Sequence, residues 1–327
     1  MNGANGVGGV NDAGGACGVT VEALARAGLT WHASGQAALS GPLLRLAEDC
    51  DRAFLRLAAI WGAEEERHPA ALPAESAERA GYLRAFPHHA VLATGLRPDE
   101  HSLNRFVDGP GVDASGRVVG AELAPPERVL TPSACYHLYV RHQGARLERA
   151  LYLTTRNTCF RNEGSYAPLR RMSSFTMREI VCVGTGRETA SFLERGRAVV
   201  DRFGALVQVP LRWRRATDPV FRPGRDPRGV FQRVQPVKRE ALYGGDDGDG
   251  DGGLALASAN RHHDHFGTAF GITRGDRPAH SACTAFGVER WLLAVVDRHG
   301  TDPASWPQLE DAAVRVRDGA WTRGGAA

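Results

Sequence analysis

Cys159-Phe160-Arg161-Asn162-Glu163-Gly164 is the stretch of sequence that decides the fold, together with Phe175 and Glu179 further along the chain. It brings together a guanidinium, a carboxylate and an aromatic ring. A fixed fork of donors on Arg161 suits an α-phosphate whose negative charge grows in a transition state. Glu163 can accept a hydrogen bond from an adenine amino group, and Phe175 can stack under the ring. An isolated Arg-x-Glu is more often a surface ion pair, so the whole string carries the ATP-site prediction.

The same stretch predicts a β-hairpin. Residues 164–168 read Gly-Ser-Tyr-Ala-Pro, which is a plausible turn. Arg161 is therefore expected on the first strand of the hairpin, and Phe175 and Glu179 on the returning strand. Since four residues separate Phe175 from Glu179, both side chains should lie on one face of that strand.

A second informative stretch is Cys283-Thr284-Ala285-Phe286-Gly287-Val288-Glu289-Arg290-Trp291-Leu292-Leu293. Its small residues predict a turn that leads into an apolar helix, with Arg290 near the start of the helix. Alone this pattern is weak, because Gly-x-x-Arg before a helix is common.

The two stretches resemble motifs 2 and 3 of class II aminoacyl-tRNA synthetases, the seryl branch in particular, and lie about 110 residues apart as in that fold. The resemblance covers roughly residues 85–310. It implies an α+β fold with a class II synthetase-like antiparallel sheet flanked by helices. It also implies that Arg161 contacts the α-phosphate and Arg290 the γ-phosphate, both as catalytic residues, while an amino acid is activated by ATP with Mg²⁺.

Periodicity gives a compatible organisation. Residues 1–19 form a Gly-rich tail that we expect to be disordered. Residues 20–80 form an N-terminal helical segment, with helices over about 21–27 and 41–61. Residues 81–327 form the catalytic domain, with strands at 90–92, 151–153 and 177–183 and an amphipathic helix over 187–203. Strands mixed with helices in this way favour α+β with a mostly antiparallel sheet.

Composition excludes several classes of protein. Lys and Arg outnumber Asp and Glu by only 40 to 37 in 327 residues, unlike in a dedicated nucleic-acid binder. No run of about 18 apolar residues predicts a membrane helix. The N-terminus does not resemble a signal peptide. Six cysteines are too few for a disulfide scaffold. These features predict a cytoplasmic protein with no membrane partner.

Cys135, Glu179 and Cys283 are candidate metal ligands. Two thiolates and a carboxylate supply three ligands for a tetrahedral Zn²⁺ and leave one position open for a substrate amine. The competing explanation is that both cysteines are small buried hydrophobic residues, since no Cys-x-x-Cys is present. Cys159 and Cys182 fit packed strand positions.

A further resemblance favours zinc. The strings Thr-Pro-Ser-Ala-Cys-Tyr-His-Leu-Tyr at 131–139, Asp-His-Phe-Gly at 264–267 and Ser-Ala-Cys-Thr-Ala-Phe-Gly-Val-Glu-Arg at 281–290 look like those of amino acid:[carrier protein] ligases. These are shortened bacterial relatives of the rare archaeal seryl-tRNA synthetases. Both groups use a Cys/Glu/Cys zinc site, which the resemblance carries to Cys135, Glu179 and Cys283. Neighbouring residues 262–265, His-His-Asp-His, look like a metal site by composition, but we expect a loop near the site.

The resemblance also implies further residues of the pocket. Lys238 could pair with the substrate carboxylate or a phosphate, and Glu240 could bind the nucleotide or its Mg²⁺. A solvated strand face is an equally good explanation for both. Ser258 and Asn260 match a Ser/Asn-containing strand that binds substrate in the seryl enzymes. Leu254, however, stands where those enzymes have a Glu that assists Mg²⁺. The Gly/Asp run at 244–253 is expected to be a solvated hairpin loop rather than a calcium site.

The acceptor of the activated amino acid is expected to be the phosphopantetheine thiol of a carrier protein rather than a tRNA. Only about 80 residues precede the catalytic part, too few for a long helical tRNA-binding arm, and the charge gives no strong field for phosphates. Arg212, Arg214, Arg215, Arg222 and Arg225 are a candidate docking patch for an acidic carrier, or a solvated loop. The resemblance implies a small amino acid as substrate and a homodimer formed through a motif near 86–106. Two alternatives are a seryl-type tRNA synthetase and a non-catalytic paralogue, which would not need to keep Arg161, Glu163, Phe175 and Arg290.

Overall fold

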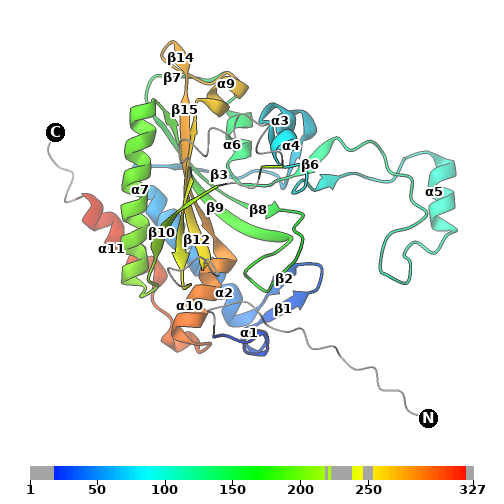
Figure 1. Ribbon diagram of the computed structural model, residues 1–327, viewed down its shortest axis with the longest axis horizontal. Coiled ribbons are helices and arrows are strands. Elements are labelled where there is room, and N and C mark those ends of the chain that lie inside the picture. Colours follow the sequence, from blue (N-terminus) through cyan, green and yellow to red (C-terminus); the bar gives the residue numbers. More distant parts are fainter. Residues whose placement is uncertain (1–17, 218–219, 222–237, 246–252, 322–327) are drawn as a thin grey trace.

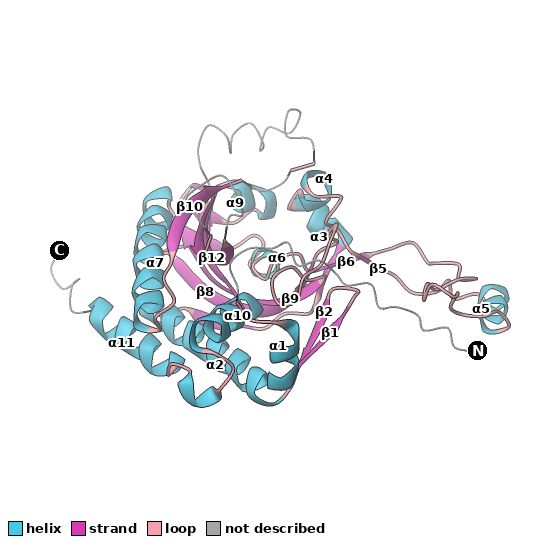
Figure 2. Cartoon of the chain, turned by 60° about the horizontal axis from the view of Figure 1, so that its bottom comes forward, coloured by secondary structure: helices cyan, strands magenta, loops and turns pink. Residues whose placement is uncertain are grey.

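A twisted central sheet holds the chain together, with helices on both sides (Figures 1 and 2). The computed structural model describes residues 18–217, 220–221, 238–245 and 253–321. In this part of the chain the sheet has seven strands in the order β10-β11-β12-β15-β9-β8-β3. Their bounds are β3 Glu64–Glu66, β8 Leu151–Phe160, β9 Ser174–Gly184, β10 Arg212–Ala216, β11 Lys238–Tyr243, β12 Leu254–His263 and β15 His280–Gly287. Neighbouring strands run antiparallel except β3, which is parallel to β8, so the predicted α+β class is confirmed.

The long helices cover one face of the sheet. They are α2 (Gly41–Ala58), α7 (Gly186–Leu206), α10 (Val288–His299) and α11 (Leu309–Trp321). A large apolar core fills the space between them and the sheet, with Phe54 of α2 stacked on Phe286 of β15 at 4.4 Å between ring centroids. Alternation along β9 directs Ile180 and Cys182 into this core and leaves Glu179 and Val181 for the opposite face.

The opposite face of the sheet carries a smaller apolar cluster and the short helices α6 (Tyr136–Arg141) and α9 (His265–Phe270). The remaining helices and 3-10 turns are α1 (Val21–Ala27), η1 (Ala59–Trp61), α3 (Ala74–Arg79), α4 (Tyr82–Ala85), α5 (Glu100–Val107) and η2 (Pro303–Ser305). The short strands outside the central sheet are β1 (Leu29–His32), β2 (Gln36–Leu39), β4 (Ala71–Pro73), β5 (Leu92–Ala93), β6 (Arg128–Leu130), β7 (Arg146–Leu147), β13 (Thr273–Arg274) and β14 (Arg277–Pro278). The segment that includes α5 projects away from the body (Figure 1).

Strands β8 and β9 form the predicted hairpin. Their register runs from Leu151 opposite Val183 to Phe160 opposite Ser174. Arg161 directly follows β8, and its amide N–H still bonds the carbonyl of Ser173 at 3.0 Å. The connecting loop is longer than the five-residue turn we expected, because it spans residues 161–173.

The stretch that begins at Cys283 is not a turn, contrary to our expectation. Residues 280–287 form strand β15 in the middle of the sheet, and α10 starts directly after it at Val288. Small residues are favoured here because the helical layer approaches closely. A Cβ on Gly196 of α7 would come within 2.7 Å of Thr284 Oγ1.

The N-terminal part of the chain is built into the same body. We expected a helical segment over 20–80, and the structure has α1, α2 and α3 there. The same range also contains strands β1 to β4, of which β3 joins the central sheet beside β8. The N-terminal tail up to residue 17, including Cys17, lies outside the described residues, as do Arg222, Arg225 and residues 246–252 of the Gly/Asp run. Tyr243 pairs with Leu254 at the ends of that run, which joins two antiparallel strands. None of the described helices is long and apolar enough to cross a bilayer.

Candidate active site

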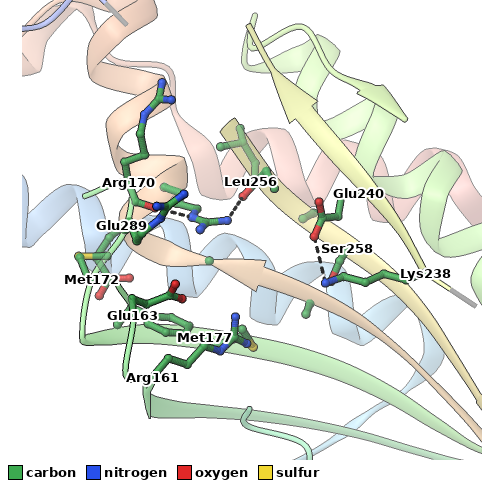
Figure 3. Close-up of a pocket in the computed structure, with 17 residues that line it drawn as sticks. Arg161, Glu163, Arg170, Met172, Met177, Lys238, Glu240, Leu256, Ser258 and Glu289 are labelled. Atoms are coloured by element: carbon green, nitrogen blue, oxygen red, sulfur yellow. Dashed lines mark hydrogen bonds and ion pairs between the residues drawn. The ribbon is translucent and has the colours of Figure 1, made fainter. Parts of the chain in front are cut away.

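A pocket opens on the face of the sheet opposite the long helices, at the start of β9 (Figure 3). It collects most of the predicted nucleotide and substrate residues from four different parts of the chain. Among its lining residues are Arg161, Glu163, Phe175, Lys238, Glu240, Ser258 and Arg290. These residues are far apart in the sequence. They meet because only β15 and β12 lie between the β8–β9 hairpin and β11 in the sheet.

Arg161 lies over the ring of Phe175. The guanidinium carbon is 5.0 Å from the ring centroid, which is a cation–π distance. Nε and one terminal nitrogen of Arg161 also donate to the carbonyl of Pro132, each at 3.3 Å. Glu163 faces the same pocket, and its Oε1 lies 4.0 Å from Nδ1 of His89.

Arg290 enters the pocket from the first turn of α10. Its Nε donates to the carbonyl of Arg170 at 3.0 Å, and its Nη1 donates to the carbonyl of Ala255 at 3.1 Å. These two carbonyls fix the guanidinium between the β8–β9 loop and β12. Burial lowers the pKa of Arg290, and the positive charge of Arg161 lowers it further. Two guanidinium groups that repel each other across one pocket suit a polyanionic ligand.

Glu289 is a pocket residue that sequence reasoning missed. Both of its carboxylate oxygens accept from the backbone N–H of Thr176, at 2.8 and 2.9 Å. Burial raises the pKa of Glu289. Strand β15 ends at Gly287, which pairs with Met177 of β9, so Thr176 has no β15 residue opposite it. The carboxylate of Glu289 accepts the hydrogen bond from this N–H instead. The only sequence signal for this role was a Glu directly before Arg290.

Lys238 and Glu240 lie on β11 at the far side of the pocket. Lys238 Nζ and Glu240 Oε1 form an ion pair of 3.0 Å (Figure 3). Both side chains are partly exposed, with 19% and 28% of their surface accessible. Ser258 lies opposite Glu240 in the register of the sheet. The strand positions predicted for these three residues are therefore correct, while their roles remain a prediction.

Cys135, Glu179 and Cys283 meet in a buried cluster beside this pocket. One ligand atom from each lies within 4.8 Å of the others. Cys135 is the N-cap residue of α6, Glu179 lies in the middle of β9, and Cys283 lies on β15, the neighbouring strand. All three are at most 3% exposed. The cluster is the one group of this kind among the described residues.

Hydrogen bonds orient Glu179 in this cluster. Oε1 accepts from Ser133 Oγ at 2.6 Å and from the amide of Cys135 at 3.1 Å. Oε2 is buried and has no hydrogen-bond partner among the described residues. A buried carboxylate oxygen without a donor is costly, which is the condition that a cation would relieve.

The two thiols of the cluster are poor acids in the absence of a cation. The hydrogen bond with Cys283 raises the pKa of Cys135, and burial and the Glu179 carboxylate raise it further. The hydrogen bond with Cys135 lowers the pKa of Cys283, but burial and Glu179 outweigh it, so that this pKa is also raised. Two thiols and a carboxylate gathered in this way match the donor set of a Zn²⁺ site with one open position.

Asn260 and His262 lie next to the sulfur of Cys283. Asn260 Nδ2 is 3.3 Å from this sulfur, and His262 Nε2 is 3.7 Å from it. Asn260 also donates to Ser258 Oγ at 3.0 Å. The role predicted for Asn260 in binding substrate stays a prediction. The expectation that residues 262–265 lie near the site is correct for His262, although they form the end of β12 and the start of α9 rather than a loop.

Two other cysteines are packed in strands, as the sequence predicted. Cys159 and Cys182 are both fully buried. Burial raises the pKa of each, Cys182 to about 12. Neither takes part in the buried cluster.

Comparison with known proteins places the chain next to two groups. No model of a protein family matches it. The chain is 34% identical to "Amino acid--[acyl-carrier-protein] ligase 1" of Bradyrhizobium diazoefficiens over 260 residues, which are 79% of this chain and 76% of that protein. It is 33% identical to ligase 2 of the same organism over 272 residues, 80% of this chain and 78% of that protein. A type-2 serine--tRNA ligase of Methanopyrus kandleri is 25% identical over 264 residues, 76% of this chain and 50% of that protein.

Among solved structures, the chain is similar to the seryl-tRNA synthetase of M. kandleri in complex with tRNASec of A. aeolicus. The TM-score is 0.73 at 19% identity, and the match covers 90% of this chain and 58% of that one. A cytoplasmic serine-tRNA ligase of Naegleria fowleri in complex with AMP follows at a TM-score of 0.63 and 15% identity, with 85% of this chain and 61% of that one covered. These likenesses establish the class II synthetase fold. The chain spans less than two thirds of the length of either synthetase.

Proposed function

The chain belongs to the family of amino acid--[acyl-carrier-protein] ligases, and we propose that it uses ATP to activate a small amino acid as an aminoacyl-adenylate and transfers it to the phosphopantetheine thiol of a carrier protein. One observation carries this proposal. Strand β9 presents Phe175 in the nucleotide pocket and, four residues on, Glu179 in the buried Cys/Glu/Cys cluster. A nucleotide and an amine can therefore bind side by side along one strand.

ATP binds across the two arginines. Phe175 stacks on the adenine, Glu163 accepts from its amino group, Arg161 contacts the α-phosphate and Arg290 the γ-phosphate. Arg161 now covers the Phe175 ring, and a move of this guanidinium toward the phosphates would uncover the stacking surface. Mg²⁺ accompanies the nucleotide, with Glu240 as a candidate ligand. Leu254 stands where the resemblance to the seryl enzymes implies a Glu. Its side chain is buried in the core and has no atom that could bind Mg²⁺.

Cys135, Glu179 and Cys283 would hold Zn²⁺, and the unpartnered Glu179 Oε2 supports this assignment. When bound, the ion supplies a Lewis acid that takes a neutral amine in its open position. Lys238 and Ser258 line the side of the pocket where the carboxylate of the amino acid would lie. Met177 lies on β9 between Phe175 and Glu179 and lines the same pocket. The small size of the amino acid is what the family resemblance implies.

The chemistry then needs no protein nucleophile. A carboxylate oxygen of the amino acid bonds to the α-phosphorus, and the bond to the β-phosphate oxygen breaks, giving aminoacyl-adenylate and pyrophosphate. Arg161 and Arg290 hold the phosphates in line and balance the charge that builds on them. The carrier thiol next bonds to the carbonyl carbon, loses its proton to solvent, and releases AMP.

A carrier protein is the better candidate acceptor than a tRNA, because the relatives that the chain covers best are named as carrier-protein ligases. The type-2 serine--tRNA ligases extend over about twice the matched length, and the chain spans only 50% of the M. kandleri protein. We also propose a homodimer, in keeping with the class II fold. The projecting segment around α5 supports it, because Val107, Val118 and Leu123 are 76%, 64% and 62% exposed.

Mass spectrometry of the acceptor tests the proposal. The protein is incubated with Mg²⁺-ATP, each amino acid in turn, and a phosphopantetheinylated carrier protein. We expect the carrier to gain the mass of one small aminoacyl group, and the unmodified carrier to gain none. A parallel reaction with tRNA distinguishes the synthetase alternative. A zinc-replete protein that shows no amino-acid-dependent exchange of pyrophosphate into ATP would point to a non-catalytic paralogue.

A further inference from the structure

A β-bulge near the end of β12 places His262 beside the buried Cys/Glu/Cys cluster. Arg261 pairs with Ala282 of β15, but the next paired residue is His263, which lies opposite Ser281. His262 is the extra residue of this irregularity, and His263 follows with a left-handed backbone at φ 53°. Bulges redirect side chains and are frequent beside functional sites. The result here is that Nε2 of His262 lies 3.7 Å from Cys283 Sγ.

Two aromatic rings pack against His262. Phe266 of α9 meets it edge to face at 5.0 Å between centroids, and Tyr139 of α6 meets it at an interplanar angle of 90°. Tyr139 and Phe266 stack on one another at 4.0 Å. Since Tyr139 is 1% exposed and Phe266 5%, the imidazole packs against a buried pair of stacked rings.

The other ring nitrogen of His262 faces two hydroxyl groups. Nδ1 lies 3.1 Å from Tyr139 Oη and 3.1 Å from Ser281 Oγ. Ser281 also hydrogen-bonds Tyr139. Burial raises the pKa of Tyr139 well above its usual range, so its hydroxyl keeps its proton and can donate it to Nδ1. A neutral imidazole that accepts at Nδ1 carries its own proton on Nε2.

We propose that His262 is a positioning residue that donates Nε2–H to the Cys283 thiolate when this sulfur binds a metal ion. The inference rests on the metal site put forward under the proposed function. A metal-bound thiolate can only accept, so the direction of the 3.7 Å contact follows from the sulfur. Ser281, Tyr139, His262 and Cys283 then form one chain of hydrogen bonds, in which each member fixes the orientation of the next.

His262 acts from outside the first coordination sphere. The group whose ligand atoms all lie within 4.8 Å of one another contains Cys135, Glu179 and Cys283 but not His262. Asn260 Nδ2 supplies a second N–H to the same sulfur. Two donors withdraw electron density from the thiolate, so the metal becomes a stronger Lewis acid toward the amine. Removing such outer partners typically weakens metal binding by about 10–100-fold.

Cobalt substitution tests this inference without using enzyme activity. Purified full-length protein is stripped of metal and titrated with Co²⁺, whose thiolate charge-transfer band reports the donor strength of the sulfur. We expect His262→Phe to bind Co²⁺ and Zn²⁺ about 10–100-fold more weakly than the wild type and to move the band to lower energy. His262→Gln, which can place an amide N–H near the sulfur, should restore most of both properties. His299→Gln is the matched control, because His299 Nε2 bonds the backbone carbonyl of Val207 far from the cluster.

The possible outcomes separate the two proposals. Wild-type protein that binds no Co²⁺ contradicts the metal site itself. Wild-type protein that binds it, with His262→Phe unchanged in affinity and in band energy, overturns the role of His262 alone. If His262→Phe does not fold, the double variant Tyr139→Phe/Ser281→Ala takes its place, because it removes both hydroxyl partners of Nδ1 and keeps the imidazole. A shift of the band to lower energy then supports the chain of hydrogen bonds, and an unchanged band refutes it.

Discussion

Arg161 and Arg290 show how side chains of like charge are held in one pocket. Arg161 donates to the backbone carbonyl of Pro132, and Arg290 donates to those of Arg170 and Ala255. These acceptors are uncharged, so they hold the guanidinium groups without neutralising them. Their positive charge stays available for a polyanion. Arginine is suited to this task because its planar fork binds phosphate oxygens in pairs, which a lysine ammonium cannot do.

Arg161→Lys should lower amino-acid-dependent pyrophosphate exchange by about 100–1,000-fold, which is the usual cost of losing a transition-state donor. The fold should be unaffected, as judged by circular dichroism. Arg156→Lys is the matched control, since Arg156 lies on the same strand hairpin, 44% exposed, and pairs with Asp51 on the other side. Equal rates of pyrophosphate exchange in the two variants would show that Arg161 has no catalytic role.

Glu289 gives a prediction for pH. Burial raises its pKa above the ordinary value of 4.5, so the folded protein holds the proton more tightly than the unfolded chain does. The contribution of Glu289 to stability is thus greatest below about pH 4.5 and is lost as the pH rises through the folded-state pKa. Glu289→Gln should therefore gain stability relative to the wild type as the pH is raised from 4 to 8, measured by urea unfolding.

Glu310 provides a control of opposite sign. The hydrogen bond from Arg56 lowers its pKa, so its contribution is present at neutral pH and is lost as the pH falls. Glu310→Gln should lose stability relative to the wild type as the pH rises over the same range. Because the side chains of Arg56 and Glu310 are 52% and 34% exposed, solvent screens the pair and the change should be small. Parallel pH profiles for the two variants would refute the assignment.

At the scale of elements, α9 packs closely against Ala279, the residue directly before β15. A Cβ on Gly267 of α9 would approach the carbonyl oxygen of Ala279 to 2.1 Å. Phe266, the neighbour of Gly267, packs on Tyr139 and on His262. Packing explains the last two residues of the string Asp264-His265-Phe266-Gly267. Glycine lets α9 approach the backbone that leads into β15, and the phenylalanine packs beside His262.

Gly267→Ala should destabilise the fold by about 3 kcal/mol, at the upper end of the usual cost of overpacking. It should also weaken metal binding, because moving α9 displaces Phe266. Gly95→Ala is the control, as no atom lies within 4 Å of a Cβ placed there, and we expect a change within about 0.5 kcal/mol. Thermal unfolding of both variants measures the difference. Similar melting temperatures would show that α9 can move away at little cost.

At the scale of the whole molecule, a buried ion pair ties the N-terminal part of the chain to the sheet. Arg178 of β9 is 1% exposed. Its Nε donates to Oδ1 of Asp51 on α2 at 2.5 Å, and its Nη2 donates to Oδ2 of the same residue at 3.0 Å. The Nη2 atom of Arg178 also donates to Oε1 of Glu65 on β3 at 2.9 Å. Burial lowers the pKa of Arg178, but the hydrogen bonds that it donates to Asp51 and Glu65 outweigh burial, so this pKa is raised overall. One residue thus joins a helix, an edge strand and the central sheet.

Asp51→Asn should cost about 3–5 kcal/mol of stability, because it leaves a buried guanidinium short of negative charge. Asp49→Asn on the same helix is the matched control. Its partner Arg52 is 52% exposed, so this pair should contribute less than about 1 kcal/mol. Chemical unfolding of both variants checks the contrast. A similar decrease in the free energy of unfolding of both variants would mean that burial does not strengthen the Asp51–Arg178 ion pair.

The sequence predicts the position and role of some residues of the site but not of others. Phe175 and Glu179 were placed on one face of one strand because a strand repeats every two residues. Cys283 was assigned to a turn, because small residues in a buried central strand look like turn residues until the helix that packs on them is known. Glu289 and His262 were not assigned any role, since their partners are a backbone N–H 113 residues away and a sulfur 21 residues away.

The sequence by itself determined the class of fold and the types of group in the pocket, because local periodicity and side-chain chemistry are properties of short stretches. It also indicated that Cys135, Glu179 and Cys283 belong together, through their likeness to a family. Only the tertiary structure decided which oxygen of Glu179 is left without a donor, where Arg161 rests, and which histidine meets the sulfur. These depend on strand register and on one bulge in β12, and both are fixed by packing across the whole sheet.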